Sequence, residues 1–561
     1  MPTTPSRDRT EMIDEIRRYA QERLPPEQQR LFETFVGQYY RHVSGGDLAA
    51  RQVHDLYGAA MSHLTMARDR PPGEPRVRVY SPDFEEHGFG SPHTVVDIVS
   101  DDMPFVVDSV TMEAIRHGLG LHLTVRPVVP VRRESGRLVD ILDRHDPASG
   151  TEAESFVHLE VDRLTDAAVL DELGRDLLRI IGDVEASVED WSAMREQALA
   201  VADAVDTDAS TFDEEDRKEA AALLRWLADD HFTFLGYREY ELGTDDGGDT
   251  LCAVPGTGLG LLRDDRSRPV SHSFAKLPPE VRRKAREPVL LNLTKANSRS
   301  TVHKPNYLDY VGVKSLSPEG VRERRFLGLM ASAAYRQSPR EIPVLRRKVQ
   351  AVLDRAGFPL NGYDGRMLLN ILESYPREEL FQIDADELYQ AATAILDIQD
   401  RQRLRLLVRR DMFGRFMSCL VYMPRDRLTT ALRTRIQDIL QAAFHGVSTQ
   451  YATQVSESVL GRLHITVQTE PGAVPEYDVA EIEARLVAAM RSWTDDLYDA
   501  LVEQFGEERG VDLHEGYAEA FPPAYQQDTS AAAAVVDIGR MEALGGRDDL
   551  GMHLYRPLEA A

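Results

Sequence analysis

The spacing of hydrophobic residues changes twice between positions 93 and 133, which predicts three elements in close succession. A β-branched apolar run at 95–99 is typical of a strand that is buried on both faces. Across 106–114 apolar residues recur every four positions and therefore share one face of a helix. At 121–126 apolar and polar residues alternate, as in a strand with one wet face. The stretch therefore predicts a compact βαβ unit.

Further strands follow this unit directly. A turn signal at 133–136 leads into an apolar segment at 138–143, and alternation returns at 156–162. His122 and His158 fall on polar positions of these strands, so we expect them on solvated faces. One helix and several strands on a small sheet predict an α+β regulatory-type unit in preference to a nucleotide-binding sheet.

The rest of the chain alternates between helical and strand-like stretches, which divides it into several domains. Helical spacing at 11–70 ends in a Pro-Pro-Gly cluster. The acidic stretch 203–216 has the composition of a solvated linker. A hairpin signal at Asp411–Gly414, between two apolar runs, predicts a second small αβ sandwich.

Three segments resemble a known family: DDMPFVVDSV at 101–110, LLNLTKANSRSTVHKPNYLDYVGVKSL at 290–316 and RRFLGLMASAAY at 324–335. Together they are similar to the N-terminal segment of the large bacterial NAD-dependent glutamate dehydrogenases, and the resemblance extends from about Tyr39 to Tyr555. It implies a regulatory and oligomerisation segment whose catalytic domain is absent from this chain. The parent enzyme would convert L-glutamate, NAD and water to 2-oxoglutarate, ammonia and NADH, as a homo-oligomer.

The resemblance also implies the fold class, which is α+β and multidomain, with ACT-like (ferredoxin-like) modules and a PAS-like module joined by helical segments. The expected domains are a helical N-terminal region at 1–72, a first ACT-like domain at 76–195, a PAS-like domain at 215–340, a helical segment at 341–400, a second ACT-like domain at 401–475, a helical segment at 476–545, and the opening strand of an incomplete third ACT-like domain at 548–561.

Composition limits the partners. The 561 residues include 66 basic and 93 acidic side chains, and the net charge of -27 repels phosphate backbones and anionic lipids. We therefore expect neither nucleic acid nor membrane as a partner. Two cysteines cannot build a disulfide framework, and no stretch approaches the ~20 apolar residues of a membrane span. These features favour the cytoplasm.

Linear motifs for catalysis are missing from the sequence. The nearest glycine cluster, GTGLG at Gly256–Gly260, lacks the spacing of a dinucleotide fingerprint and is better interpreted as a hairpin turn. None of the lysines lies in the glycine-rich context that the family uses to activate its substrate. We therefore expect no catalytic residue, metal ligand or cofactor here, with NAD bound only in the parent enzyme. The purified chain should neither bind NAD nor oxidise glutamate.

The first candidate site is the loop Asp101, Asp102, Met103, Pro104 and Phe105, which precedes the predicted helix at 106–114. In ACT modules this position holds an amino-acid effector, because free N–H groups at a helix N-terminus suit a carboxylate. Ligand-binding modules usually carry glycine where Phe105 stands, so this side chain would close the site. A plain helix capped by aspartate is the alternative.

The second candidate site is a polar patch that could receive an anion or an acidic surface of a neighbouring subunit. Its members are Lys295, Asn297, Ser298, Arg299, Ser300, His303 and Lys304, with Arg322, Arg324 and Arg325 a short strand away. The alternative is a solvated strand face with internal salt bridges.

The expected partners are therefore a missing dehydrogenase domain in cis, further copies of the chain and an amino-acid effector. A free-standing small-molecule sensor without catalytic activity is the alternative function. Residues 551–557 alternate like the opening strand of another module, with too few residues after it to complete a sheet.

Overall fold

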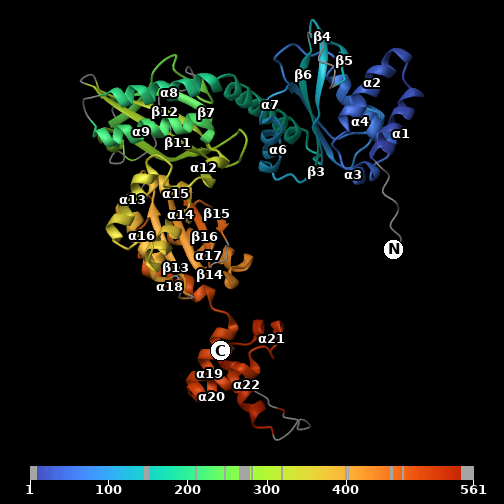
Figure 1. Cartoon of the computed structure of the whole chain (residues 1–561). Helices are drawn as coiled ribbons and strands as arrows, with labels where there is room; N and C mark the ends of the chain where they lie inside the picture. Colours follow the sequence, from blue (N-terminus) through green and yellow to red (C-terminus); the bar gives the residue numbers. More distant parts are fainter. Residues whose placement is uncertain are drawn as a thin grey trace. The chain divides into compact units, whose positions relative to one another are not determined.

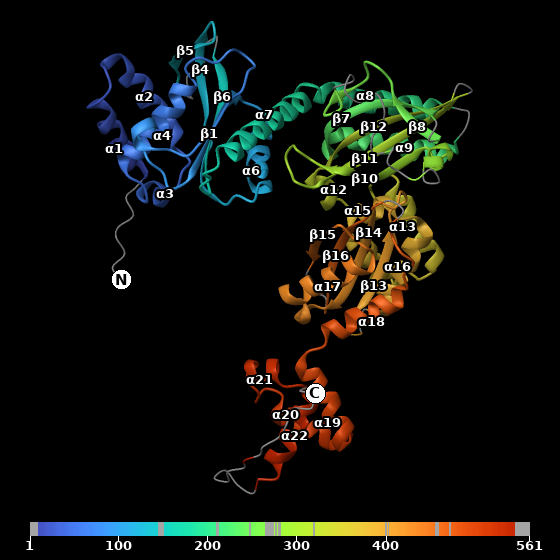
Figure 2. The same ribbon diagram turned by 180° about the vertical axis from the view of Figure 1, so that it is seen from behind.

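The computed structural model describes residues 9–143, 151–208, 212–245, 248–263, 274, 278, 282–317, 320–398, 401, 403–454, 459–470, 473–544 and 552. They form two compact units. Figures 1 and 2 show the helices and strands of the chain from opposite sides. The first unit comprises 1–354 with 373–385, and the second comprises 355–372 with 386–561. No helix among the described residues is both long and apolar enough to cross a membrane.

The first sheet of the first unit is antiparallel, in the order β1-β2-β6-β4-β5, with β3 paired to β6. Its strands are β1 (Arg76–Tyr80), β2 (Thr94–Asp101), β3 (Leu121–Val125), β4 (Val128–Glu134), β5 (Arg137–Ile141) and β6 (Glu152–Val161). Because β2 and β3 both pair with β6, they run parallel on either side of it. The predicted βαβ unit is therefore present, split by one antiparallel strand.

Helices cover both faces of this sheet. They are α1 (Arg9–Gln21), α2 (Pro26–Tyr39), α3 (Gly45–Ala49), α4 (Val53–Met66), α5 (Phe84–His87), α6 (Val106–Arg116) and α7 (Ala167–Glu189). Val99 packs with α1, α2 and α4, whereas Val96 and Ile98 pack with α6 and α7. The β-branched run is buried on both faces for this reason.

The second sheet of the first unit has the order β10-β11-β12-β7-β8, with β9 paired to β7. Its strands are β7 (Phe232–Asp245), β8 (Gly248–Ala253), β9 (Leu259–Gly260), β10 (Leu291–Arg299), β11 (Tyr307–Ser317) and β12 (Gly320–Met330). Figure 1 shows α8 (Trp191–Thr207) and α9 (Glu214–Trp226) lying across it. The remaining helical elements among the described residues of this unit are η1 (Leu227–His231), η2 (Arg283–Arg286), α12 (Ser332–Arg336), α13 (Leu345–Ala356) and α15 (Arg377–Gln382).

The second unit is built on a third antiparallel sheet, in the order β13-β14-β16-β15. Its strands are β13 (Arg405–Arg410), β14 (Phe416–Pro424), β15 (Ser448–Gln454) and β16 (Leu460–Gln468). The helical elements are α14 (Tyr363–Ser374), α16 (Ala385–Ile398), η3 (Arg425–Arg427), α17 (Thr430–Ala443), α18 (Val479–Met490), α19 (Trp493–Phe505), α20 (Glu507–Tyr517), α21 (Pro523–Asp528) and α22 (Ala531–Glu542). Apolar residues of α17 and α18 cover this sheet. The helices α19, α20 and α22 share a separate small core.

The predicted α+β multidomain class is confirmed by these mixed sheets and helices. The strand expected at 551–557 lies outside the described residues except for Met552, whose side chain is exposed.

Candidate functional site

The first predicted site lies between β2 and α6, where the chain turns into the helix. The helix begins at Val106, and the residue before it, Phe105, has a left-handed backbone with φ of 74° and offers no side-chain cap. Asp101, expected to suit the helix start, instead forms an ion pair with the buried guanidinium of Arg70. The loop therefore begins with an ion pair between the half-exposed Asp101 and the buried Arg70, and it ends in a strained turn, not in an aspartate cap.

The second predicted site is divided by the structure into separate groups. Arg322 pairs with Glu239 and Glu241, at 3.4 and 2.5 Å. Arg325 is buried and pairs with Glu323 at 3.1 Å. Further members of the patch face other neighbours: Arg324 approaches Glu239 at 3.8 Å, Arg299 lies over the ring of Tyr307, Lys295 faces Asp309 and Glu378, and Asn297 is exposed. Much of the patch is neutralised within the first unit, because carboxylates stand beside its arginines.

One member of the patch meets the first site. His303, in the connection between β10 and β11, donates its backbone N–H to the Ser109 hydroxyl at 3.0 Å. Its ring nitrogen Nδ1 lies 3.1 Å from the Asp108 carboxylate, and the ring centroids of His303 and Phe105 are 4.8 Å apart. The first turn of α6 is therefore in contact with the connection that leads from β10 to Lys304 and β11, and the effector site expected here stays a prediction.

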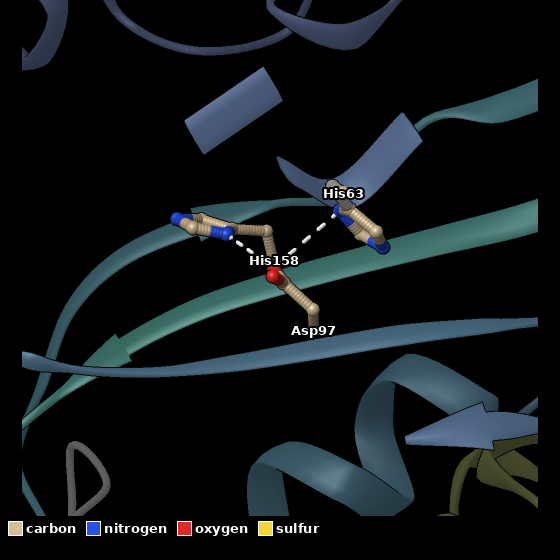
Figure 3. A group of neighbouring side chains, drawn as sticks. All are labelled: His63, Asp97 and His158. Atoms are coloured by element: carbon tan, nitrogen blue, oxygen red, sulfur yellow. Dashed lines mark hydrogen bonds and ion pairs between the residues drawn. The ribbon is translucent and has the colours of Figure 1, made fainter. Parts of the chain in front are cut away.

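A buried cluster that the sequence did not reveal lies under α4 (Figure 3). It joins His63 of α4, Asp97 of β2 and His158 of β6, the last two facing each other across the strand pair. His158 Nδ1 lies 2.7 Å from Asp97 Oδ1, and His63 Nδ1 lies 3.5 Å from the same oxygen. Our expectation of a solvated His158 is wrong, since its side chain is 2% exposed. Helices α1 to α4 cover the face that we expected to be wet.

Further hydrogen bonds complete this cluster. Arg78 and Tyr80 of β1 both donate to Asp97 Oδ2, each at 2.9 Å. His63 Nε2 lies 3.0 Å from the carbonyl oxygen of Ile98, so this nitrogen carries the proton. His63 Nδ1 is then the acceptor of the Tyr39 hydroxyl, at 2.9 Å.

The charges of the cluster follow from burial and from these partners. Burial lowers the pKa of His63 to about 4, so this ring is neutral near pH 7. Burial opposes the ionisation of Asp97, but the surrounding histidines and Arg78 outweigh it and hold the pKa of Asp97 below its usual range. Burial also raises the pKa of Tyr80, which therefore stays protonated and remains a donor. The result is one carboxylate stabilised by several donors.

This donor set fits a closed hydrogen-bond network better than a metal centre. Two ligands of a tetrahedral zinc ion lie about 3.3 Å apart when their bonds are ~2.0 Å long. His158 and Asp97 approach to 2.7 Å, which is a hydrogen-bond distance. His63 Nδ1 already accepts from Tyr39, and Arg78 places a positive charge beside the carboxylate.

A second group of possible ligands, Glu113, His117 and Asp176, joins α6 to α7. His117 Nε2 lies 3.0 Å from Asp176 and 3.4 Å from Glu113. Arg116 pairs with both carboxylates, and Arg179 lies 3.3 Å from Asp176. These guanidinium groups would compete with a cation, so the group fits a partly buried ion-pair network.

The glycine cluster at 256–260 forms a turn and a short strand. Gly256 has φ of 75°, and Gly260 pairs with Gly236 of β7. A Cβ atom on Gly260 would lie 2.2 Å from the carbonyl oxygen of Leu235. Packing against β7 therefore accounts for glycine at this position.

The fold and these clusters define the class of the molecule, an α+β protein of several domains with small antiparallel sheets. Models of glutamate dehydrogenase domains match four of its parts. They are the ACT1 domain at 35–177, helical motif 1 at 342–401, the ACT2 domain at 405–494 and helical motif 2 at 500–544.

Three curated relatives carry the name NAD-specific glutamate dehydrogenase. The chain is 39% identical to the protein of Halomonas elongata, over 98% of this chain and 34% of the relative. It is 36% identical to the protein of Pseudomonas aeruginosa, over 93% of this chain and 32% of the relative. It is 31% identical to the protein of Mycobacterium tuberculosis, over 85% of this chain and 29% of the relative. The chain thus spans about a third of the length of the curated relatives it matches.

These comparisons correct several expectations. Similarity to NAD-specific enzymes runs along 98% of the chain. The expectation of a non-catalytic segment or sensor is therefore not supported. The same holds for the expectation that the chain has no NAD and for the expectation that a dehydrogenase domain is missing in cis. Those expectations rested on absent linear motifs. A motif search sees only residues that are close in sequence, and His63, Asp97 and His158 show how readily distant residues assemble.

Proposed function

We propose that this chain acts in the NAD-dependent oxidation of L-glutamate to 2-oxoglutarate and ammonia. The observation that carries the proposal is the 39% identity to an NAD-specific glutamate dehydrogenase over 98% of the chain. The matches to ACT domains and helical motifs of glutamate dehydrogenase support it independently. The cytoplasm, an assembly of several copies and a PAS-type role for the second sheet remain predictions within this proposal.

The turn at Gly256–Gly260 does not fit a dinucleotide. In a dinucleotide fingerprint, glycine lets the pyrophosphate approach the backbone. Here a side chain at Gly260 would collide with the carbonyl oxygen of Leu235, so protein already fills that space. We therefore assign no step of the reaction to this turn.

An absorbance assay of NADH formation tests the proposal. The protein that carries these 561 residues should reduce NAD in the presence of L-glutamate, and D-glutamate is the control that should give no signal. Calorimetric titration with NAD should show binding in the same preparation. A folded preparation that neither binds NAD nor forms NADH would contradict the proposal.

A further inference from the structure

The short helix α15 belongs to the first unit, although the chain on both sides of it does not. Residues 373–385 lie in the first unit, whereas 355–372 and 386–561 lie in the second. The helix contacts β10, and its Leu380 is fully buried. A helix of six residues is too short to be stable alone in water. It therefore keeps its shape only while it is docked on the first unit.

A lysine of α13 favours the docked state. Lys348 Nζ donates to the carbonyl oxygens of Leu380, Phe381 and Ile383, at 3.0, 3.0 and 2.8 Å. These carbonyl groups lie at the C-terminal end of α15, where intrahelical partners are missing and a cation is favoured. Lysine stays charged up to a pKa of about 10.4, so this contact does not change between pH 5 and pH 8.

The first residue of α15 opposes docking. Arg377 is 8% exposed, and its Nη2 donates to the carbonyl oxygen of Gln337 at 3.0 Å. Its Nε and Nη1 have no hydrogen-bond partner in the described part of the chain. Burial lowers the pKa of Arg377, and the charge of Glu373 only partly opposes this. A buried guanidinium in this state is costly, and release of the helix into water would remove that cost.

An excess of negative charge also opposes docking. Lys295 Nζ of β10 lies 2.7 Å from Asp309 of β11 and 3.0 Å from Glu378 of α15, so two carboxylates share one lysine. The three groups carry one negative charge when all are ionised. The Tyr335 hydroxyl of α12 donates to Glu378 at 2.9 Å, and burial raises the pKa of this hydroxyl, which therefore stays protonated. Of the two carboxylates, only Glu378 would leave with α15.

Docking changes the affinity of Asp309 for a proton. In the docked state burial raises the pKa of Asp309, Lys295 opposes this and Glu378 adds to it. Release removes Glu378 and lets water reach Asp309, while Lys295 stays beside it on the neighbouring strand. The pKa of Asp309 is therefore higher in the docked state. By linkage, docking takes up a proton and becomes more favourable as the pH falls.

We propose that α15 is a latch that releases from the second sheet while the rest of the first unit stays folded, and that a proton on Asp309 closes it. The unpaired Arg377 and the excess carboxylate lower the free energy of release, whereas Lys348 and the buried Leu380 favour closure. Release would leave one crossing of the chain between the two units, at 354–355, in place of three. The latch would thus control how tightly the chain links the two units.

Amide hydrogen exchange of the full chain tests the latch. Exchange is followed by mass spectrometry on peptides that cover α15 and the central strand β12, and rates are corrected for the intrinsic effect of pH on exchange. Amides of α15 should exchange at least about tenfold faster than those of β12, because release is local. Protection of α15 should fall at least about threefold between pH 5 and pH 8, as Asp309 loses its proton.

Two variants separate the two features that oppose docking. Asp309→Asn removes the titrating carboxylate but keeps an oxygen that can accept the Met330 N–H. Exchange of α15 should slow at least about threefold at pH 8 and lose its pH dependence. Arg377→Met removes the unpaired guanidinium and should slow exchange at least about threefold at every pH. Arg336→Met, at an exposed position of α12, is the matched control and should exchange like the parent.

Equal corrected rates in α15 and β12 would overturn the proposal, because the helix would then open only when the whole unit unfolds. Protection that stays constant between pH 5 and pH 8 would do the same, as would an Asp309→Asn protein that keeps the pH dependence of the parent. Faster exchange in a folded Arg377→Met protein would show that this arginine holds the helix in place, which also contradicts the latch. The pH profile of the parent keeps the test valid if a variant fails to fold. None of these outcomes bears on NADH formation, which the proposed function predicts separately.

Discussion

Asp97 is fully buried in the first sheet, and its charge persists because donors surround it. The neighbouring His63 is buried as well, and burial keeps its ring neutral near pH 7. In the unfolded chain, by contrast, a histidine has a pKa of about 6.5 and gains a proton more readily. Stability should therefore depend on pH through this residue.

We expect the free energy of unfolding to fall as the pH drops from about 6.5 to 4. The folded state keeps His63 neutral over this range, while the unfolded state binds a proton. This difference lowers the free energy of unfolding by about 3 kcal/mol in all. Above about pH 6.5 histidine is neutral in both states, so no stability is lost through His63 there. Urea melts at several pH values measure it.

The variant His63→Gln should show a flatter pH dependence, because glutamine cannot take up this proton. His54→Gln, at a partly exposed position of the same helix, should keep the slope of the parent. An equal slope in all three proteins would show that His63 does not govern this range.

Gly260 offers a second test at this scale. Gly260→Ala should destabilise the first unit by about 2 to 3 kcal/mol, because φ is 58° and the new Cβ atom meets the Leu235 carbonyl oxygen. Gly256→Ala is the matched control. That residue also has a positive φ, but no described atom outside its chain neighbours lies within 4 Å of its Cβ position, so about 1 to 2 kcal/mol is expected. Equal losses in thermal melts would contradict the packing explanation.

The elements that follow local periodicity could be predicted from the sequence. The apolar run at 95–99 lies within β2 (Thr94–Asp101), and the four-residue repeat falls on α6 (Val106–Arg116). What surrounds these elements could not be predicted. Asp101 is paired with Arg70, which lies 31 positions away in sequence, and His158 is covered by helices from the start of the chain. Periodicity reports which face is apolar, but not which distant segment packs there.

The candidate sites show the same limit. Phe105 and His303 were both predicted, in separate sites, and nothing local indicates that their rings meet. Both residues have positive φ, which is unusual for residues other than glycine. Such a contact depends on the tertiary fold of the first unit, and only the structure shows it.

The contact between α6 and the β10–β11 connection predicts an exchange experiment. Ser109→Ala removes the acceptor of the His303 N–H, which should cost about 1 kcal/mol locally. Amide hydrogen exchange at His303 should then accelerate about fivefold. Thr111→Ala, on the same helix, is the control. Unchanged exchange in Ser109→Ala would mean that this hydrogen bond does not hold the connection in place.

At the scale of the whole molecule, the predicted basic patch carries less unpaired charge than the sequence suggests. The net charge is -27, yet arginines of the predicted patch already face Glu239, Glu241 and Glu323. Motif searches at this scale indicated a chain without NAD, and comparison with whole proteins corrected that expectation. Similarity over a long alignment uses many positions, whereas a motif search depends on a few.

One apolar core passes from the first sheet through α7 to the second sheet. It contains Ile98 and Val157 from the first sheet, Leu177 from α7, and Leu235 and Leu327 from the second. The two modules are therefore joined by an apolar interface. Recombination between related genes that replaced only one module would pair surfaces that had diverged separately. Replacement of 76–330 as a single block would preserve the packing between the two modules. We therefore expect the two modules to have been exchanged between genes as one block.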